Sequence, residues 1–235
     1  MPPDSVAEIV ARHRITGDSF AVLEGIPMFT DPLGQDYFLL PQTCTSDRAR
    51  QAALMTYILN VGTEYGRREP TDFPVTPFCA DEIDRIISRQ RRNRWSYDDD
   101  LAFVHRNGAR VVTTPNAMLM GVGGNLIQRL FSQQAGTAWG DIFMVNIACA
   151  DPAAMLAQIT ESGHAWFADG RGQPRESGLG LDRVLHHEER HARQWADRGY
   201  LGMLVGYGVQ LVGERVFGRP NRYEVDAGLS DGGYG

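Results

Sequence analysis

The stretch Val184-Leu185-His186-His187-Glu188-Glu189-Arg190-His191-Ala192-Arg193-Gln194-Trp195 holds the most specific pattern in this chain of 235 residues. It lies within residues 179–198, where the spacing of apolar residues predicts one long helix that ends at Gly199. His187 and His191 are four residues apart, so a helix places both imidazoles on one face, about 6 Å apart at Cβ. Two imidazoles in this arrangement can converge on one metal ion.

The pentapeptide from His187 to His191 has the form HExxH, which joins two metal-binding histidines to a general base. Glu188 projects beside the two imidazoles and is expected to take a proton from water held by the metal. Gln194 lies three residues beyond His191 on the same face, where its amide can hydrogen bond to a ligand.

The same helix has a second interpretation as an ordinary charged surface helix whose histidines are incidental. In that case His186, Glu189 and Arg190 mark its solvated side. A run of arginines earlier in the chain is also interpreted as a solvated helix face, neutralised by the acidic residues that follow it, with a phosphate-binding patch as the alternative. The run and the acidic residues are Arg89, Arg91, Arg92, Arg94, Asp98, Asp99 and Asp100.

A zinc site needs a third ligand, and the C-terminal region offers Glu224. Asn221, Glu224 and Ala227 are spaced to share one helical face, which would bring the Glu224 carboxylate to the metal. Alternatively, Asn221 caps this helix and Glu224 reaches back to it in a variant of the capping box. Weaker ligand alternatives are Asp226, Asp197 and Glu214.

An HExxH helix followed later in the chain by a helix-borne glutamate resembles the gluzincin group of zinc metallopeptidases. More closely, the chain resembles small bacterial proteins with an HExxHxxQ helix, over about residues 138–234. The residues that carry this resemblance are His187, Glu188, His191, Gln194, Gly199, Tyr207, Asn221, Glu224 and Ala227. The resemblance implies that His187, His191 and Glu224 bind zinc and that Glu188 is the base.

The remaining pattern predicts an α+β fold: a zincin-like active-site helix, a sheet of short strands and additional N-terminal helices. Helices are expected over about residues 47–61 and 81–95, and residues 139–149 carry the strongest strand pattern. We expect a mostly helical part of unassigned role over residues 1–137 and a metal-binding part over residues 138–235, or one continuous domain. The glycine-rich residues 231–235 are interpreted as a flexible tail.

Composition limits the partners and the location. A net charge of −6 and a sequence pI of about 5.5 argue against a nucleic-acid partner. Three widely spaced cysteines and the lack of an apolar signal-peptide core predict a cytoplasmic protein with reduced thiols. The apolar segment from Gly199 to Gly213 is too short to cross a bilayer, which takes about 20 apolar residues. We interpret it as a buried helix, with self-association through Gly199 to Phe217 as the alternative.

Three protein ligands leave one position for water, as in catalytic zinc sites. We therefore expect a zinc-dependent hydrolase, specifically a metallopeptidase, with Zn²⁺ as cofactor and Glu188 as general base. A peptide or protein substrate is expected to pair with an edge strand from residues 139–149. Side chains considered for stabilising the oxyanion are Tyr207, Tyr223, His164 and His186. Two alternatives stay open: a non-catalytic zinc-binding scaffold or interaction protein, and a metal-free module that self-associates or binds membrane surfaces.

Overall fold

The computed structural model describes residues 3–63, 65–66, 71–124, 136–217 and 221–233, and their side chains except those of residues 3 and 207–217. Its helical elements are α1 (Pro3–His13), η1 (Gly17–Leu23), α2 (Ser46–Leu59), α3 (Ala80–Arg92), η2 (Ser96–Asp100), α4 (Leu101–Arg106), α6 (Pro152–Ser162), α7 (Leu181–Phe217) and α8 (Arg222–Ala227). Its strands are β1 (Met28–Thr30), β2 (Asp36–Phe38), β3 (Arg110–Thr113), β4 (Leu119–Val122), β5 (Gly136–Trp139), β6 (Ile142–Val145), β7 (His164–Ala168) and β8 (Pro174–Gly180). The predicted α+β class is confirmed.

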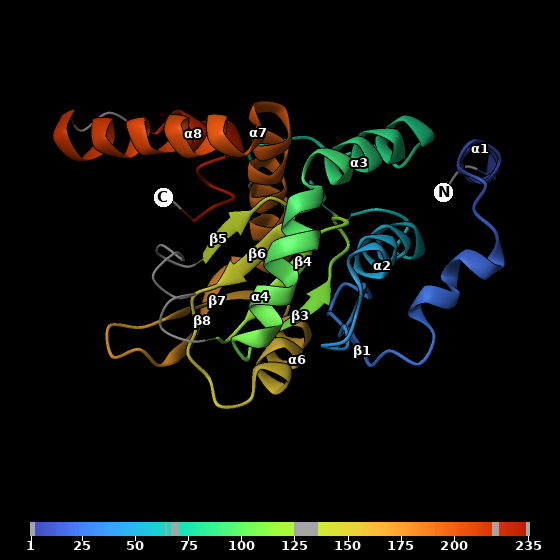
Figure 1. Ribbon diagram of the computed structural model, residues 1–235, viewed down its shortest axis with the longest axis horizontal. Coiled ribbons are helices and arrows are strands. Elements are labelled where there is room, and N and C mark those ends of the chain that lie inside the picture. The colour runs from blue at the N-terminus through green and yellow to red at the C-terminus, as the bar shows by residue number, and fades with distance from the viewer. Residues whose placement is uncertain (1–2, 64, 67–70, 125–135, 218–220, 234–235) are drawn as a thin grey trace.

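A four-stranded mixed sheet in the order β3-β4-β6-β5 forms the centre of the molecule (Figure 1). β4 and β6 are parallel, and the two outer pairs are antiparallel. The β1–β2 hairpin continues this sheet past β3 through a bridge between Leu39 and Val112. Strands from residues 110–122 and 136–145 share one ladder, so a boundary near residue 137 falls inside the sheet. The N-terminal part, expected to be mostly helical, therefore contributes half of the central strands.

Alternating residues of the strands build two apolar layers, because successive side chains point to opposite faces of a sheet. One layer packs against α2, α3 and α4, and its strand residues include Val111, Leu119, Ile142 and Met144. The other packs against α6 and the first half of α7, and its strand residues include Val112, Met120, Phe143 and Val145. Helix α7 is thus held on the sheet by its own apolar residues, Leu181, Val184, Leu185 and Ala192.

Residues 139–149, predicted as one strand, contain a tight turn instead. Trp139 pairs with Ile142 across an antiparallel ladder, and Gly140 takes a left-handed φ of 57° at the turn. Glycine adopts this conformation without steric cost, which allows the chain to reverse. Asp141 then fixes the turn, because its fully buried carboxylate accepts hydrogen bonds from Asn93 Nδ2 at 2.7 Å and Tyr97 Oη at 3.1 Å.

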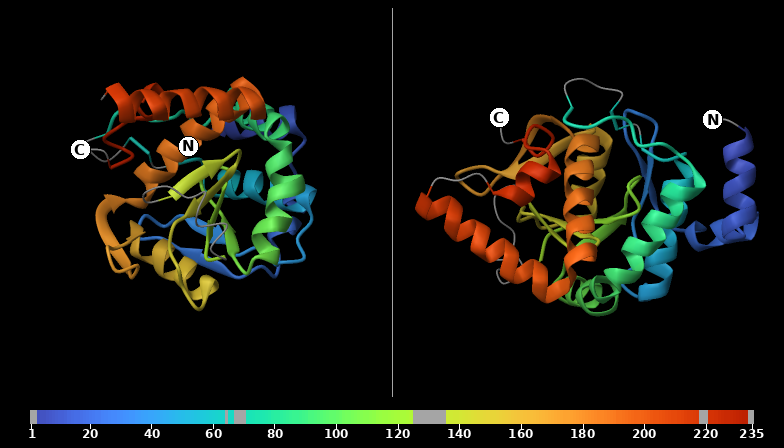
Figure 2. Two further views of the ribbon diagram at one scale, coloured as in Figure 1. Left: turned by 60° about the vertical axis from the view of Figure 1, so that its left-hand side comes forward. Right: turned by 90° about the horizontal axis from the view of Figure 1, so that it is seen from above.

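Gly199 bends the long helix α7 rather than ending it. Its φ of 71° and ψ of 166° break the helix, which resumes in a new direction and continues to Phe217 (Figure 2). The sequence predicted that a helix ends at Gly199 and that another helix follows it, and both the break and the helical segment after it are confirmed. That segment follows at once because the residues after Gly199 include good helix formers.

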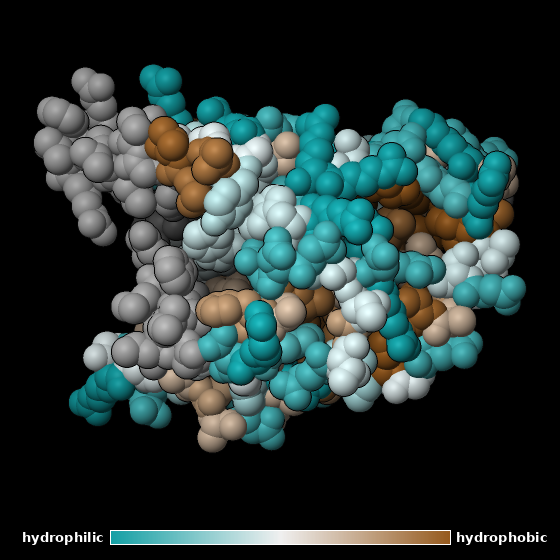
Figure 3. Space-filling view, in the orientation of Figure 1, coloured by the Kyte–Doolittle hydropathy of each residue, from teal (hydrophilic) through white to brown (hydrophobic). Residues whose placement is uncertain are grey.

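The beginning of this second segment is exposed, in contrast to the buried helix that we expected. Leu201 is 75% exposed and Val205 is 67% exposed, and apolar surface is visible on this part of α7 (Figure 3). Self-association through the segment stays a prediction. No helix among the described residues has the length and apolar character needed to cross a bilayer.

Candidate metal centre

Two helices bring together the three predicted ligands. His187 and His191 lie one turn apart on α7, and Glu224 comes from α8. The Nε2 atoms of the two histidines are 3.1 Å apart, and each is 3.3 Å from Oε2 of Glu224. Three ligand atoms from distant parts of the chain thus form a nearly equilateral triangle.

The size of this triangle fits zinc. Zinc binds nitrogen and oxygen ligands at about 2.0–2.1 Å with tetrahedral angles, which places any two ligand atoms about 3.3–3.4 Å apart. The three measured separations of 3.1, 3.3 and 3.3 Å agree with that spacing. Two imidazoles and one carboxylate are also a ligand set found in catalytic zinc sites.

Hydrogen bonds on the far side of each imidazole orient the ligand atoms. His187 Nδ1 lies 2.9 Å from the carbonyl oxygen of Gly228, and His191 Nδ1 lies 2.9 Å from Oε1 of Gln194. Both partners are acceptors, so each Nδ1 carries the proton, and in the neutral ring the Nε2 lone pair points toward Glu224. Two lone pairs and a carboxylate that face one another favour a cation between them.

Gln194 occupies the supporting position that its spacing predicted. Its Nε2 donates to the carbonyl oxygen of Tyr223 at 3.0 Å and to Oδ2 of Asp226 at 2.9 Å. These two acceptors fix the amide so that Oε1 faces His191. Gln194 therefore connects α7 to α8, the helix that carries Glu224.

Helix α8 is capped as expected, and its glutamate turns to the histidines. Asn221 Oδ1 accepts a hydrogen bond from the backbone N–H of Tyr223 at 3.0 Å, while Oε2 of Glu224 faces the two imidazoles. Burial alone would raise the pKa of Glu224, but hydrogen bonds and positive charge from His187 and His191, when their rings are protonated, hold it well below its usual range. A low pKa keeps Glu224 in the ionised form that binds metal.

The weaker ligand alternatives lie elsewhere. Asp226 is engaged by Gln194, and Asp197 is an exposed partner of Arg92 at 2.8 Å. The side chain of Glu214 lies outside the described residues, as does that of Tyr207.

Glu188 is buried beside the triangle with an oxygen that has no protein partner. Only 8% of the residue is exposed, and Oε2 has no hydrogen-bond partner among the described residues. Burial raises the pKa of its carboxyl to about 7. The charge of His187 acts in the opposite direction and lowers this pKa, whereas the charge of Glu224 adds to the increase. A carboxylate with a pKa near neutrality is suited to accept and return a proton.

The other side chains considered for stabilising the oxyanion of the reaction make contacts of their own with other residues. His186 stacks on Tyr65 with ring centroids 3.5 Å apart, and burial lowers its pKa to about 4. His164 lies on the β7–β8 hairpin, with Nδ1 2.7 Å from Glu176. The ring of Tyr223 is buried under the guanidinium of Arg198.

The C-terminal segment, expected to be a flexible tail, is fixed against the metal centre through residue 233. Asp231 is fully buried and receives four hydrogen bonds. Its partners are Tyr65 Oη, Thr71 Oγ1 at 3.0 Å, Asp72 N at 3.2 Å and Arg183 Nε at 2.9 Å. Composition alone missed this segment, because a glycine-rich sequence is equally typical of a mobile tail and of a tightly packed one.

The interpretation of α7 as a solvated surface helix is wrong on the side where Glu189 lies. Glu189 is 3% exposed, and its carboxylate is in contact with Arg85, Arg89 and Arg193. Burial alone would raise the pKa of Glu189, but these arginines hold it far below its usual range. Arg89 is also buried, rather than solvated as we expected, and its Nε lies 3.2 Å from Oδ1 of Asp141.

All residues of the centre are enclosed in this conformation. His187 is 2% exposed, and His191, Glu188 and Glu224 are each 8% exposed. Comparison with protein-family models, curated proteins and solved structures finds no match to this chain. The resemblance to gluzincins therefore rests on the residues of this centre and on their spacing.

Proposed function

We propose that this protein is a zinc-dependent hydrolase, specifically a metallopeptidase. The observation that carries the proposal is the triangle of His187 Nε2, His191 Nε2 and Glu224 Oε2, whose sides match the spacing of zinc ligands. A three-ligand set of this type leaves a fourth position open to water or substrate.

In the proposed reaction, separate residues bind the metal ion, transfer the proton and orient a ligand. When bound, zinc acts as a Lewis acid that polarises a carbonyl group and lowers the pKa of water. Glu188 accepts a proton from the attacking water and returns it to the leaving amine, a role that its pKa of about 7 supports. His187, His191 and Glu224 hold the ion, and Gln194 keeps His191 in the tautomer that can bind it.

A peptide substrate has a strand available for pairing. Within the described residues β5 is an edge of the sheet, whereas β6 is internal between β4 and β5. The centre of β5 is tied to the metal-bearing helix, because Trp195 Nε1 on α7 donates to the carbonyl oxygen of Ala138 at 3.0 Å. An extended peptide that added to β5 would therefore run beside α7.

The test combines metal analysis with catalysis. We expect about one zinc per chain by mass spectrometry in the wild type, and little in His187→Ala and Glu224→Ala. Glu188→Gln is expected to keep zinc and lose turnover of a quenched fluorescent peptide library by at least about a hundredfold. Asp197→Asn, an exposed site on the same helix, is the matched control for both measurements. A wild-type chain that binds no zinc after reconstitution would falsify the proposal.

A second function is favoured by the closure of the centre. Because each residue of the centre is at most 8% exposed, a zinc site could serve as a structural scaffold rather than a catalyst. In that case zinc raises the midpoint of thermal unfolding, and Glu188→Gln leaves every measured property of the zinc-bound protein unchanged.

A further inference from the structure

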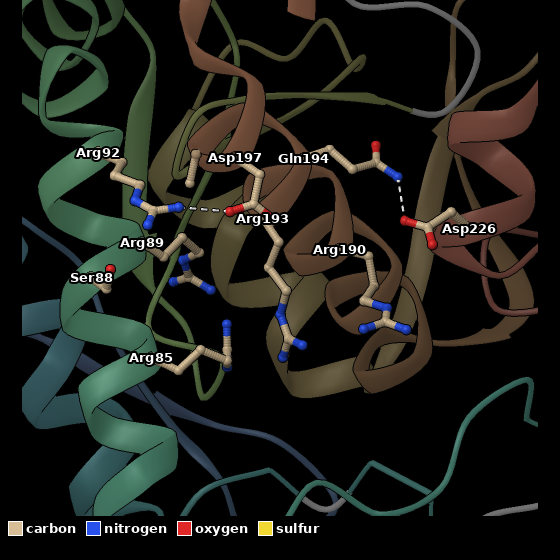
Figure 4. Close-up of a pocket in the computed structure, with 10 residues that line it drawn as sticks. Arg85, Ser88, Arg89, Arg92, Arg190, Arg193, Gln194, Asp197 and Asp226 are labelled. Carbon is tan, nitrogen blue, oxygen red and sulfur yellow. Dashed lines mark hydrogen bonds and ion pairs between the residues drawn. The ribbon is translucent and has the colours of Figure 1, made fainter.

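A cavity of about 490 Å³ opens between α3 and α7, on the flank of the metal-bearing helix. Five arginine side chains line it, together with two aspartates, a serine, an alanine and Gln194 (Figure 4). The arginines are Arg85, Arg89, Arg92, Arg190 and Arg193. Half of the lining residues are therefore arginines, and they come from two facing helices.

Three of these arginines are neutralised by carboxylates of the protein. Arg85 pairs with Glu82 and Glu189, and Arg89 pairs with Glu189 and Asp141. The third, Arg92, is paired with Asp197 in a bond that is drawn in Figure 4. These contacts neutralise the charges of the three groups within the protein itself.

Arg190 and Arg193 keep donors that the protein does not use. No carboxylate lies within ion-pair distance of Arg190 among the described residues, and its Nε is buried without a hydrogen-bond partner. Its guanidinium lies over the ring of Phe73, with Cζ 4.3 Å from the centroid. Such stacking fixes the plane of the group and leaves its N–H edge available.

Arg193 contributes the second set of donors. Its Nε lies 2.6 Å from Glu189, while its Nη2 is 3.7 Å from Glu82, which is too far for a hydrogen bond. Arg190 and Arg193 are three residues apart on α7, so their side chains project from neighbouring positions of one helix surface. Figure 4 shows both guanidinium groups pointing to the same side of the cavity.

The remaining charged residue of the wall is Asp226. This carboxylate is on the exposed rim, where it accepts a hydrogen bond from Gln194 at 2.9 Å and is screened by solvent. It therefore does not neutralise Arg190. Two planar guanidinium groups with free donors in a concave site are suited to bidentate recognition of an oxyanion.

We propose that this cavity binds a small oxyanion, a carboxylate or a phosphate, through Arg190 and Arg193. The site is distinct from the metal centre, because its lining includes none of His187, His191 and Glu224. The two sites share only the side chain of Gln194, which lines the cavity and orients His191. Oxyanion binding does not require that the proposed hydrolase activity exists.

The experiment is isothermal titration of the full-length chain with inorganic phosphate and, separately, with succinate, at constant ionic strength set by chloride. Arg190→Ala is expected to raise the Kd by about tenfold or more, since it removes a charged fork. Arg190→Lys retains the charge and the aliphatic stem but lacks the fork, and is expected to weaken binding by about threefold or more. The matched control is Arg91→Ala, an exposed arginine of α3 outside the cavity wall.

The outcomes distinguish a phosphate ligand from a carboxylate ligand, and they test the oxyanion site separately from the proposed hydrolase activity. Saturable binding of phosphate alone assigns a phosphorylated ligand, binding of succinate alone assigns a carboxylate, and both support the site. Binding that is absent in the wild type, or equal in wild type, Arg190→Ala and Arg190→Lys, overturns it. The titrations are repeated after zinc removal with a chelator. Phosphate binding that persists without zinc supports the oxyanion site whether or not the hydrolase proposal holds, and binding that is lost with the zinc overturns it.

Discussion

Gly232 lies directly against the imidazole of His187. A β-carbon built on this glycine would be 2.5 Å from Cε1 of the ring, 2.7 Å from Nδ1 and 2.9 Å from Nε2. Four residues earlier the same segment supplies the carbonyl oxygen of Gly228, which accepts from His187 Nδ1. The segment from Gly228 to Gly232 thus both orients the imidazole of a proposed metal ligand and covers it.

Substitution of Gly232 by alanine is expected to displace His187 and to lower zinc affinity by about tenfold or more, because an imidazole that is turned away cannot complete the triangle. The measurement is competition for zinc against a chromophoric chelator. Gly178→Ala is the control, since a β-carbon there meets no atom within 4 Å. Equal zinc affinities in the two variants would show that the contact has no bearing on the metal.

Removal of the Gln194 side chain tests how the tautomer of His191 is fixed. Gln194→Ala removes the acceptor for His191 Nδ1 and the link to α8, and comparable changes cost about 10–100-fold in metal affinity. Gln194→Glu keeps the acceptor and should recover much of the loss. An unchanged zinc Kd in Gln194→Ala would contradict the assigned role.

The buried cluster around Glu189 is expected to dominate the stability of α7. Glu189→Gln removes the charge shared by Arg85, Arg89 and Arg193, and leaving buried cations uncompensated costs about 3–5 kcal/mol. Urea unfolding of the zinc-free protein measures this loss. Asp197→Asn breaks an exposed pair with Arg92 and is expected to cost about 1 kcal/mol or less. Similar losses of unfolding free energy in the two variants would contradict the prediction that the buried cluster contributes more to stability than the exposed pair.

The buried carboxyl of Asp100 is expected to make the folding stability of the protein depend on pH. Burial, and then the charge of Asp99, raise its pKa to about 6, and its buried Oδ2 has no hydrogen-bond partner within the part of the chain that the structure describes. The folded pKa of Asp100 is above the unfolded value of about 3.9, so protonation of Asp100 stabilises the folded state. This contribution to the free energy of unfolding is fully present at pH values below about 4 and is lost as the pH rises through 6.

Asp100→Asn is therefore expected to be more stable than the wild type at pH 7.5, with a difference that shrinks as pH falls from 6 to 4. Urea midpoints at pH 4.5 and 7.5 measure this effect. Asp99→Asn should reduce the difference only in part, since Asp99 is the smaller cause. A wild type that gains no stability relative to Asp100→Asn on acidification would contradict the assignment.

Local sequence patterns predicted several features of the candidate metal centre. The spacing of His187 and His191 placed both imidazoles on one face because a helix repeats about every 3.6 residues. Gln194 followed from the same periodicity, and the cap at Asn221 followed from residue type. The break at Gly199 was visible for the same reason, since glycine adopts positive φ without steric cost.

Charged residues misled the sequence-based interpretation of α7 and α3. Glu189 and Arg89 have the composition of solvated helix faces, yet each is 3% exposed. Burial of a charge depends on whether an opposite charge from another element meets it, and that partner lies a hundred residues away. The hairpin within residues 139–149 was missed because Asp141, a buried turn residue, finds its hydrogen-bond donors on other elements.

The sequence by itself determined the ligand face of α7 and the type of residue that could complete it, because both follow from helical periodicity and side-chain chemistry. Only the tertiary structure brought Glu224 within 3.3 Å of both imidazoles and placed Gly232 against His187. Likewise, only the packing of α3 against α7 gathered five arginines around one cavity. These relationships join residues far apart in the chain, and their geometry is set by how helices and sheet pack rather than by any local propensity.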